Sequence, residues 1–127
     1  MIDFLNAGSA LPLSDESFNA ITTAMETFLI LSGALKTAFR EILLEVTLKK
    51  GTYILTAGAK QPHLWFILEG LLREITVDRY TQQAHTSWFW FNNSFVYAMP
   101  GFFDQAPSSV SIEVVKDTKV ILLSYPQ

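Results

Sequence analysis

The sequence predicts a mainly β protein whose helices lie only in its N-terminal part, and three observations support this. Apolar residues recur at helical spacing up to about residue 46, and the period then changes to two. Glycines and other turn residues interrupt the second part every few positions. The chain has 127 residues, 50% of them hydrophobic, which suits the core of one compact domain. We therefore expect one domain over residues 1–127, helical at 1–45 and a β-roll at 46–125.

The first predicted helix begins after Ser14, whose hydroxyl can cap free backbone N–H groups. Asp15 and Glu16 suit the positive end of the helix dipole, and Leu13 can pack on Phe18 as a hydrophobic staple. The apolar positions that follow at helical spacing are Phe18, Ile21, Met25 and Phe28.

Ser32 and Gly33 predict a break before a second helical segment. Two helices, or one helix kinked near Gly33, both fit the pattern. The second apolar stripe consists of Leu35, Phe39, Ile42, Leu43 and Val46.

Short strands joined by tight turns are predicted for the rest of the chain. Gly70 lies between two apolar runs, where a hairpin would need a residue at positive φ. A further turn is expected at Lys116 to Thr118. Eight strands at this spacing predict an antiparallel sandwich or barrel. The expected strands are Val46–Leu48, Tyr53–Thr56, Leu64–Leu68, Leu71–Val77, Ala84–Phe91, Phe95–Tyr97, Ser109–Val115 and Lys119–Tyr125.

Charge and composition argue against several classes of protein. Nine Lys and Arg against twelve Asp and Glu give a net charge of −3, and the cations form no cluster for nucleic acid. The absence of Cys excludes disulfides and zinc–thiolate sites. The N-terminus lacks early Lys or Arg, and no apolar run reaches the ~20 residues of a spanning helix. We expect a cytoplasmic protein that binds no membrane.

Five motifs follow one another in a specific order between residues 48 and 118. They are Leu48-Lys49-Lys50-Gly51, Leu55-Thr56-Ala57-Gly58, Trp65-Phe66-Ile67-Leu68-Glu69-Gly70-Leu71-Leu72-Arg73, Trp88-Phe89-Trp90-Phe91 and Ile112-Glu113-Val114-Val115-Lys116-Asp117-Thr118. With them, Leu13 to Tyr125 resembles the cyclic-nucleotide-binding domain of bacterial Crp/Fnr-type transcription regulators, in a divergent Bacteroidetes-like branch. The resemblance implies an eight-stranded jelly roll, or double-stranded β-helix, that senses a small ligand.

The resemblance also implies a phosphate-binding cassette after the aromatic strand. In the family, a Gly-Glu pair, a short helix and an Arg followed by a small residue hold the cyclic nucleotide. Here Tyr97 and Ala98 fall at the Gly-Glu pair, Ser108 at the Arg and Ser109 at the small residue. An Arg grips phosphate with a permanent charge and two parallel bonds, whereas Ser offers one neutral bond. The cassette is therefore degenerate, and we do not expect tight cyclic AMP binding.

Some anion-binding features persist in this segment. Pro100 suits the first position of a short helix ending at Gln105, whose free N–H groups would favour an anion. No Lys or Arg occurs between Arg79 and Lys116, so the backbone and hydroxyls would hold that anion. A second interpretation treats the prolines as ordinary turns bounding a helical plug. The candidate ligand-binding residues are Tyr97, Ala98, Met99, Gly101, Ser108 and Ser109.

Aromatic residues fill half of the sixteen positions from Trp88 to Phe103. We predict that Phe89, Phe91 and Phe95 lie in the core. Trp88 and Trp90 share the opposite face of the strand, where they would mark either a partner surface or a site under the helices.

The remaining candidate residues indicate neither a metal site nor an enzyme. His63 and His85 are the only histidines, and the His-x-His pattern of metal-binding cupins is absent. No nucleophile elbow or Gly-rich phosphate loop occurs. Arg73 is expected to pair with a carboxylate. We predict no catalytic residues and no cofactor beyond a cyclic nucleotide or another small anion.

Two functions stay open, a ligand-sensing regulatory domain and a protein-interaction module that kept the fold and lost the site. Crp/Fnr-type regulators continue into a dimerisation helix and a DNA-binding part, whereas this sequence stops at Gln127. We therefore expect no direct DNA binding by the chain as given. A homodimer or a regulatory protein partner would then carry its signal.

Overall fold

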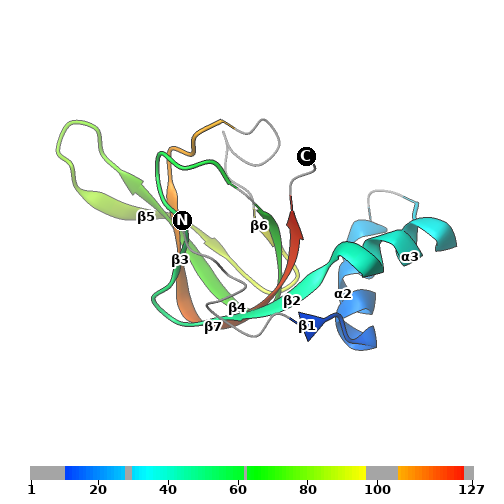
Figure 1. Ribbon diagram of the computed structural model, residues 1–127. Coiled ribbons are helices and arrows are strands. Elements are labelled where there is room, and N and C mark those ends of the chain that lie inside the picture. The colour runs from blue at the N-terminus through cyan, green and yellow to red at the C-terminus, as the bar shows by residue number, and fades with distance from the viewer. Residues whose placement is uncertain (1–10, 28–29, 62, 97–105, 125–127) are drawn as a thin grey trace.

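The computed structural model describes residues 11–27, 30–61, 63–96 and 106–124, and these form a β-roll with two helices packed at one end (Figure 1). The predicted class, mainly β and antiparallel with helices in the N-terminal part, is confirmed. The elements are β1 (Leu11–Pro12), α2 (Asp15–Met25), α3 (Gly33–Ile42), β2 (Leu44–Leu48), β3 (Tyr53–Leu55), β4 (His63–Val77), β5 (Ala84–Trp90), β6 (Phe95–Val96) and β7 (Ser111–Ser124).

β7 is the common partner of three strands. The strand order is β1-β2-β7-β4-β5, while β3 also pairs with β7 and β6 also pairs with β4. All of these pairings are antiparallel. The long pair β4 and β7 extends from His63 opposite Ser124 to Ile75 opposite Ser111. These two strands therefore form the spine to which the other strands attach.

The hairpin predicted at Gly70 is wrong, because β4 continues through this residue. Gly70 has φ +147°, and three register shifts against β7 occur between Ile67 and Leu72. A Cβ at Gly70 would lie 2.1 Å from Thr118 Oγ1, so only glycine fits here. The glycine therefore marks a bend in a long strand. A bend and a hairpin both place a glycine between two apolar runs, so the local sequence could not distinguish them.

The turn predicted at Lys116 to Thr118 is also wrong, since β7 passes through it without interruption. The buried Thr118 accepts a hydrogen bond from Leu71 N at 3.2 Å and donates one to Lys116 O at 2.7 Å. These bonds hold β7 beside the bend of β4. Seven strands are consequently present among the described residues where eight were predicted for the chain, and one of the seven, β1, precedes the helices.

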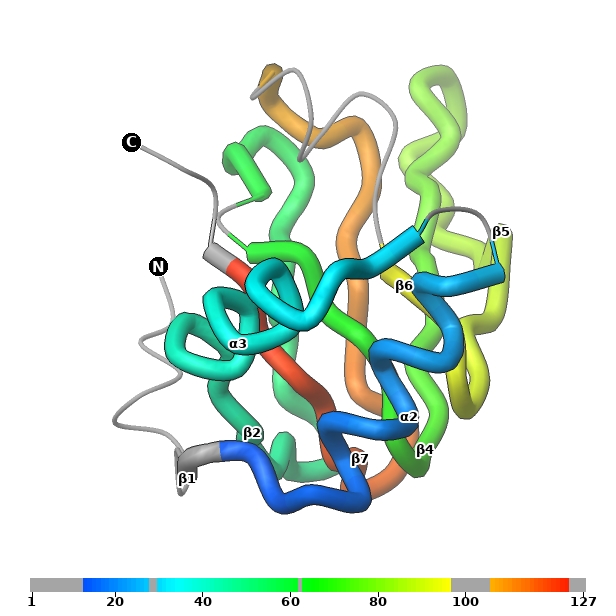
Figure 2. The backbone as a smooth tube through the Cα atoms, turned by 90° about the vertical axis from the view of Figure 1, so that its right-hand side faces the viewer, coloured from blue at the N-terminus to red at the C-terminus, as the bar shows by residue number. Residues whose placement is uncertain are grey.

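Alternation along β4 and β7 divides the core into two clusters. Trp65 and Ile67 of β4 face the inside of the roll, together with Val120 and Leu122 of β7. The intervening residues face the helices and form a second cluster, whose buried members are Leu13, Ile21, Leu43, Phe66 and Ile121. Figure 2 shows both helices in front of the C-terminal half of β7. This part of the sheet is therefore covered on both faces.

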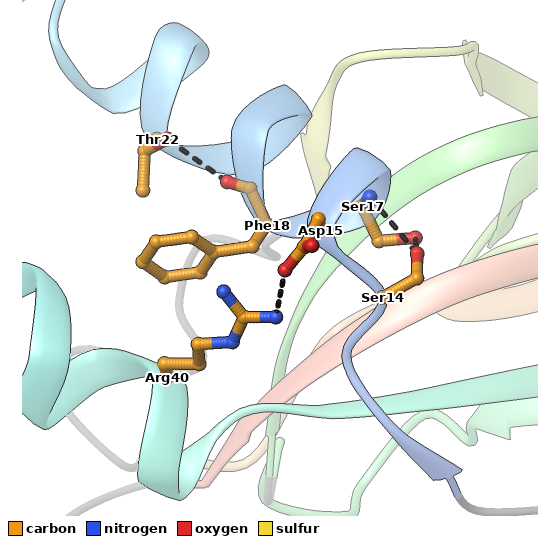
Figure 3. Close-up of polar contacts among 6 residues, drawn as sticks. All are labelled: Ser14, Asp15, Ser17, Phe18, Thr22 and Arg40. Carbon is orange, nitrogen blue, oxygen red and sulfur yellow. Dashed lines mark hydrogen bonds and ion pairs between the residues drawn. The ribbon is translucent and has the colours of Figure 1, made fainter.

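The helix starts agree with the sequence. Ser14 caps α2 and accepts a hydrogen bond from Ser17 N at 3.1 Å, and Ser32 caps α3, so the break near Gly33 separates two helices. Figure 3 shows Arg40 of α3 reaching α2, where it pairs with Asp15. The Arg40 guanidinium also lies 5.1 Å from the centre of the Phe18 ring. Neither described helix is long and apolar enough to cross a membrane.

The prediction for the aromatic strand was wrong in part. Phe89 and Phe91 are 44% and 60% exposed, whereas Phe95 is half-buried against Phe66 as expected. Trp90 is half-buried and packs on the core inside the roll, and Trp88 is 59% exposed. Both faces of the strand carry large aromatics, so alternation alone could not show which face points inward.

Candidate functional site

The predicted cassette lies only partly within the described residues. Tyr97, Ala98, Met99 and Gly101 lie outside them, as does the predicted short helix from Pro100 to Gln105. Ser108 and Ser109 are described, and so are the residues that flank segment 97–105 on both sides. The described part of the site therefore consists of its two flanks.

Ser108, which the resemblance aligns with the family's arginine, is buried with 3% of its surface exposed. Its hydroxyl donates to Val110 O at 2.8 Å and accepts from Val110 N at 3.1 Å. The hydroxyl proton is therefore already used within the turn, and an anion would have to compete for it. Ser109, next to it, is exposed.

The loop between β3 and β4 holds the C-terminal flank of the cassette. We call residues 57–61 the anchor loop. Gly58 N donates to Ser108 O at 2.7 Å, and Ser108 N donates to Ala59 O at 2.8 Å. Lys60 and Pro107 form an isolated antiparallel bridge beside these bonds. This pairing fixes the backbone on which Ser108 sits.

The same loop also holds the N-terminal flank through Gln61, whose side chain is fully buried. The Gln61 amide donates to Val96 O at 3.1 Å and to His63 O at 2.7 Å. A buried amide costs free energy unless its hydrogen bonds are made, so these contacts are structurally important. Both ends of segment 97–105 are thus attached to one loop.

Apolar residues from both flanks line the inside of the roll. Val96 and Val110 belong to the same buried cluster as Leu72 and Ile112, and Trp90 packs against this cluster. Trp88 makes an edge contact with Trp90, with ring centres 6.4 Å apart. The two tryptophans therefore lie on the β5 face that points toward the flanks of the cassette, which was not foreseen.

The arginine that the sequence singled out points away from this interior. Arg73 pairs with Glu113 at 2.6 Å, as predicted, and its side chain is 39% exposed. Lys60 is an exposed cation. Its backbone pairs with that of Pro107, so it lies beside the C-terminal flank of the cassette. Sequence reasoning missed Lys60 and Gln61, since their roles arise from a pairing between distant segments that has no local signal.

Two other hollows contain none of the predicted site residues. One, of about 380 Å³, lies between α2 and the sheet and includes Glu16, Glu45, Glu69 and a single cation, Lys119. Three carboxylates against one ammonium do not suit an anionic ligand. The other, also about 380 Å³, lies on the outer face beside Arg73, Glu113 and Phe89.

The histidines do not form a metal site in the described part of the chain, where no group of three His, Cys, Asp or Glu could hold an ion. His63 is the first residue of β4 and is half-buried. Burial lowers the pKa of His63 below its ordinary value of 6.5. His85 is exposed on β5.

Solved structures share this fold at low sequence identity. A cyclic nucleotide-binding domain from Methylobacillus flagellatus superimposes with a TM-score of 0.82 and 17% identity, over 98% of this chain and 71% of that one. The catabolite activator protein of Thermus thermophilus gives a TM-score of 0.64 at 17% identity, over 77% of this chain and 45% of that one.

A third similar structure is the regulatory subunit of a cAMP-independent protein kinase A from Trypanosoma brucei. It is a triple mutant, with one threonine replaced by arginine, bound to cAMP in the A site. The TM-score is 0.72 at 17% identity, over 87% of this chain and 40% of that one. At this identity, these three similarities establish the fold alone.

The sequence itself shows the family. No curated protein matches the chain significantly. The profile of the cyclic nucleotide-binding domain, however, matches residues 45–127, which is more than half of the chain. The match includes every strand from β3 to β7 and both flanks of the cassette. The chain therefore belongs to the cyclic nucleotide-binding domain family.

Proposed function

We propose that this chain is a ligand-sensing regulatory domain related to those of Crp/Fnr-type transcription regulators, with a cassette too degenerate to bind cyclic AMP tightly. It has no catalytic activity of its own in this proposal, and it acts in the cytoplasm on a partner or on a second copy. Membership of the cyclic nucleotide-binding family supports the sensing role. The finer statements about affinity and mechanism rest on the cassette flanks.

The observation that carries the proposal is the state of Ser108. A cyclic phosphate needs a charged donor, and a charge-assisted bond contributes about 1.5–3 kcal/mol, against about 1 for a neutral one. Ser108 is neutral, buried and already bonded to Val110. Arg73, on a neighbouring strand, is engaged by Glu113 on the outer face. Loss of the family's arginine is therefore not compensated by either residue.

The Trypanosoma brucei protein gives an instructive parallel. A subunit described as cAMP-independent is bound to cAMP in a mutant that includes an introduced arginine. This supports the idea that a domain can keep the fold while its cassette lacks the charge that cyclic AMP requires. By the same reasoning, a different small anion is the better candidate ligand here, held by backbone N–H groups and Lys60.

Calorimetric titration of the whole chain with cyclic AMP and cyclic GMP tests the proposal. We expect no measurable heat at concentrations that saturate ordinary members of the family. The variant Ser109→Arg adds a guanidinium at an exposed position of the flank and should gain affinity for cyclic AMP. Tyr80→Arg adds the same charge in the distant β4–β5 turn and should gain none. Tight binding by the unmodified chain, lost in Ser109→Ala, would contradict the degenerate cassette.

A thermal-shift screen of anionic metabolites tests the wider sensing role. A ligand at 100 times its dissociation constant adds about 2.7 kcal/mol of stability. Lys60→Ala should reduce the shift given by an anion bound at the cassette, whereas Lys36→Ala on α3 should not. If no compound shifts the unfolding temperature, the alternative function applies, a protein-interaction module that kept the fold and lost ligand binding.

A further inference from the structure

The strand β5 has a neighbour on only one side. It pairs with β4 from Leu72 opposite Trp90 to Val77 opposite Ala84. It lies at the end of the strand order, and no other strand of the described residues pairs with it. Figure 1 shows the β4–β5 hairpin projecting from the side of the roll away from the helices. Its outer edge therefore offers backbone N–H and C=O groups to another chain.

This edge lacks the usual protection against association. Natural edge strands are commonly guarded by charged residues or proline. Residues 84–91 contain no Asp, Glu, Lys, Arg or Pro, and they end in four consecutive aromatics. Every residue from Ala84 to Phe89 is exposed, so neither face is covered along most of the strand.

A bulge divides β5 and leaves its aromatic end regular. Glu74 and Ile75 of β4 face Trp88 and Thr86, so Ser87 is the extra residue. The Ser87 hydroxyl donates to Glu74 Oε2 at 3.0 Å and accepts from Thr76 at 2.8 Å, which fastens the bulge to β4. Beyond it, residues 88–90 pair in regular succession with residues 74–72. The segment that is free to pair further is therefore the aromatic one.

We propose that the aromatic end of β5 pairs antiparallel with the same strand of a second copy, about a two-fold axis at Phe89. This inference concerns an interface and does not depend on the identity of any ligand. A two-fold axis perpendicular to the sheet places each side chain of β5 opposite a side chain of the second copy on the same face of the sheet. With the axis at Phe89, this side chain faces Phe89 of the partner subunit on the outer face. On the inner face, Trp88 lies opposite Trp90 of the partner subunit.

The strand favours a copy of itself over an unrelated peptide. Aromatic cross-strand pairs stabilise antiparallel sheets, and this register matches aromatic with aromatic on both faces. Arg73, the β4 residue opposite Phe89, is already neutralised by Glu113, so its charge does not oppose the approach of a second copy. A charged peptide would find no uncompensated charge along residues 84–91 to bind.

An engineered disulfide gives a direct test, because the chain contains no cysteine. Directly opposite residues in an antiparallel pair have Cα atoms about 4.5–5.5 Å apart, within the range of about 4.4–6.8 Å that a disulfide spans. Phe89→Cys should therefore form a covalent dimer under mild oxidation. Tyr80→Cys, in the exposed β4–β5 turn, is the matched control and should stay largely monomeric on a non-reducing gel.

Sedimentation velocity over a wide range of concentrations supplies the second readout. The unmodified chain should shift from one to two copies as its concentration rises, and Phe89→Lys should abolish the shift. Circular dichroism should show that this variant keeps its fold, because Phe89 is exposed. A chain that stays monomeric at every concentration overturns the proposal. So does a dimer that survives Phe89→Lys and is not captured by Phe89→Cys.

Discussion

The two halves of the β4–β7 spine have opposite environments. From Trp65 to Leu68, β4 is covered on both faces, by the roll core on one side and by the helices on the other. Beyond Gly70, only one face is buried, and Arg73 and Glu113 occupy the other. The same two strands thus provide a two-sided core at one end and a sheet with one solvent-exposed face at the other. The bend at Gly70 and Thr118 makes this change possible.

The largest effect is expected from the bend itself. Gly70→Ala places a Cβ 2.1 Å from Thr118 Oγ1 in a backbone conformation that L residues rarely adopt. Positive φ alone costs about 1–3 kcal/mol, and overpacking adds about 1–3 kcal/mol or more. Gly51→Ala is the matched control, since Gly51 has φ +89° but nothing within 4 Å. Equal free energies of unfolding for the two variants, from urea titration, would show that the close approach is unimportant.

The second prediction compares a phenylalanine of the covered region with a phenylalanine of the exposed strand β5. Phe66 is 1% exposed between the sheet and the helices, and Phe89 is 44% exposed on β5. Phe66→Ala should lower the free energy of unfolding by about 3–5 kcal/mol, because it leaves a cavity. Phe89→Ala should change it by about 0.5 kcal/mol, measured at a concentration where the chain is monomeric. Similar losses in the two variants would mean that the aromatic strand is covered after all.

A smaller effect is expected from the ion pair between Arg73 and Glu113, which lies on the exposed face beyond Gly70. Glu113→Gln removes the carboxylate that accepts from Arg73 at 2.6 Å, in a setting that is only partly exposed. We expect a loss of about 0.5–1 kcal/mol that shrinks in high salt, because solvent screens such pairs. Glu26→Gln breaks the more exposed pair with Lys36 on the helices and should cost less. A loss for Glu113→Gln that does not respond to salt would point to packing as its cause.

The smallest effect concerns pH. Because burial lowers the pKa of His63, the unfolded chain binds a proton more readily than the folded one. Stability should therefore be complete above the ordinary value of 6.5 and decrease as the pH falls through it. His63→Gln should remove this part of the dependence, and His85→Gln, on the exposed strand, should leave it in place. Denaturant unfolding at several pH values measures both, and an unchanged profile for His63→Gln would refute the assignment.

Local features of the fold were predictable from the sequence because their causes are local. Ser14 and Ser32 begin helices since their hydroxyls satisfy N–H groups three residues away. The pairing of Arg73 with a carboxylate was predictable because a charged residue on a strand, here between Leu72 and Glu74, is most simply a partly exposed charge with a carboxylate partner. Family resemblance, carried by the order of several short motifs, added the roll architecture that no single motif could indicate.

The remaining features depend on contacts between distant segments. The bend at Gly70 depends on Thr118, and the faces of β5 depend on the bulge at Ser87, so neither was visible in the local pattern. The anchor loop was missed for the same reason, because Gln61 meets Val96 only in the folded chain. Of the predicted site, Ser108 and Ser109 are placed, and the roles proposed for both remain predictions.

The position of β7 in the chain has a consequence for how the protein is made. β2, β3 and β4 all pair with β7, and all three precede it in the sequence. While a ribosome is still synthesising residues before Ser111, these strands lack their common partner and their apolar faces stay open. Contacts between segments so far apart in sequence also slow the search for the native state. The segment before β7 must therefore stay soluble while it lacks this partner, and the roll can close only when β7 emerges.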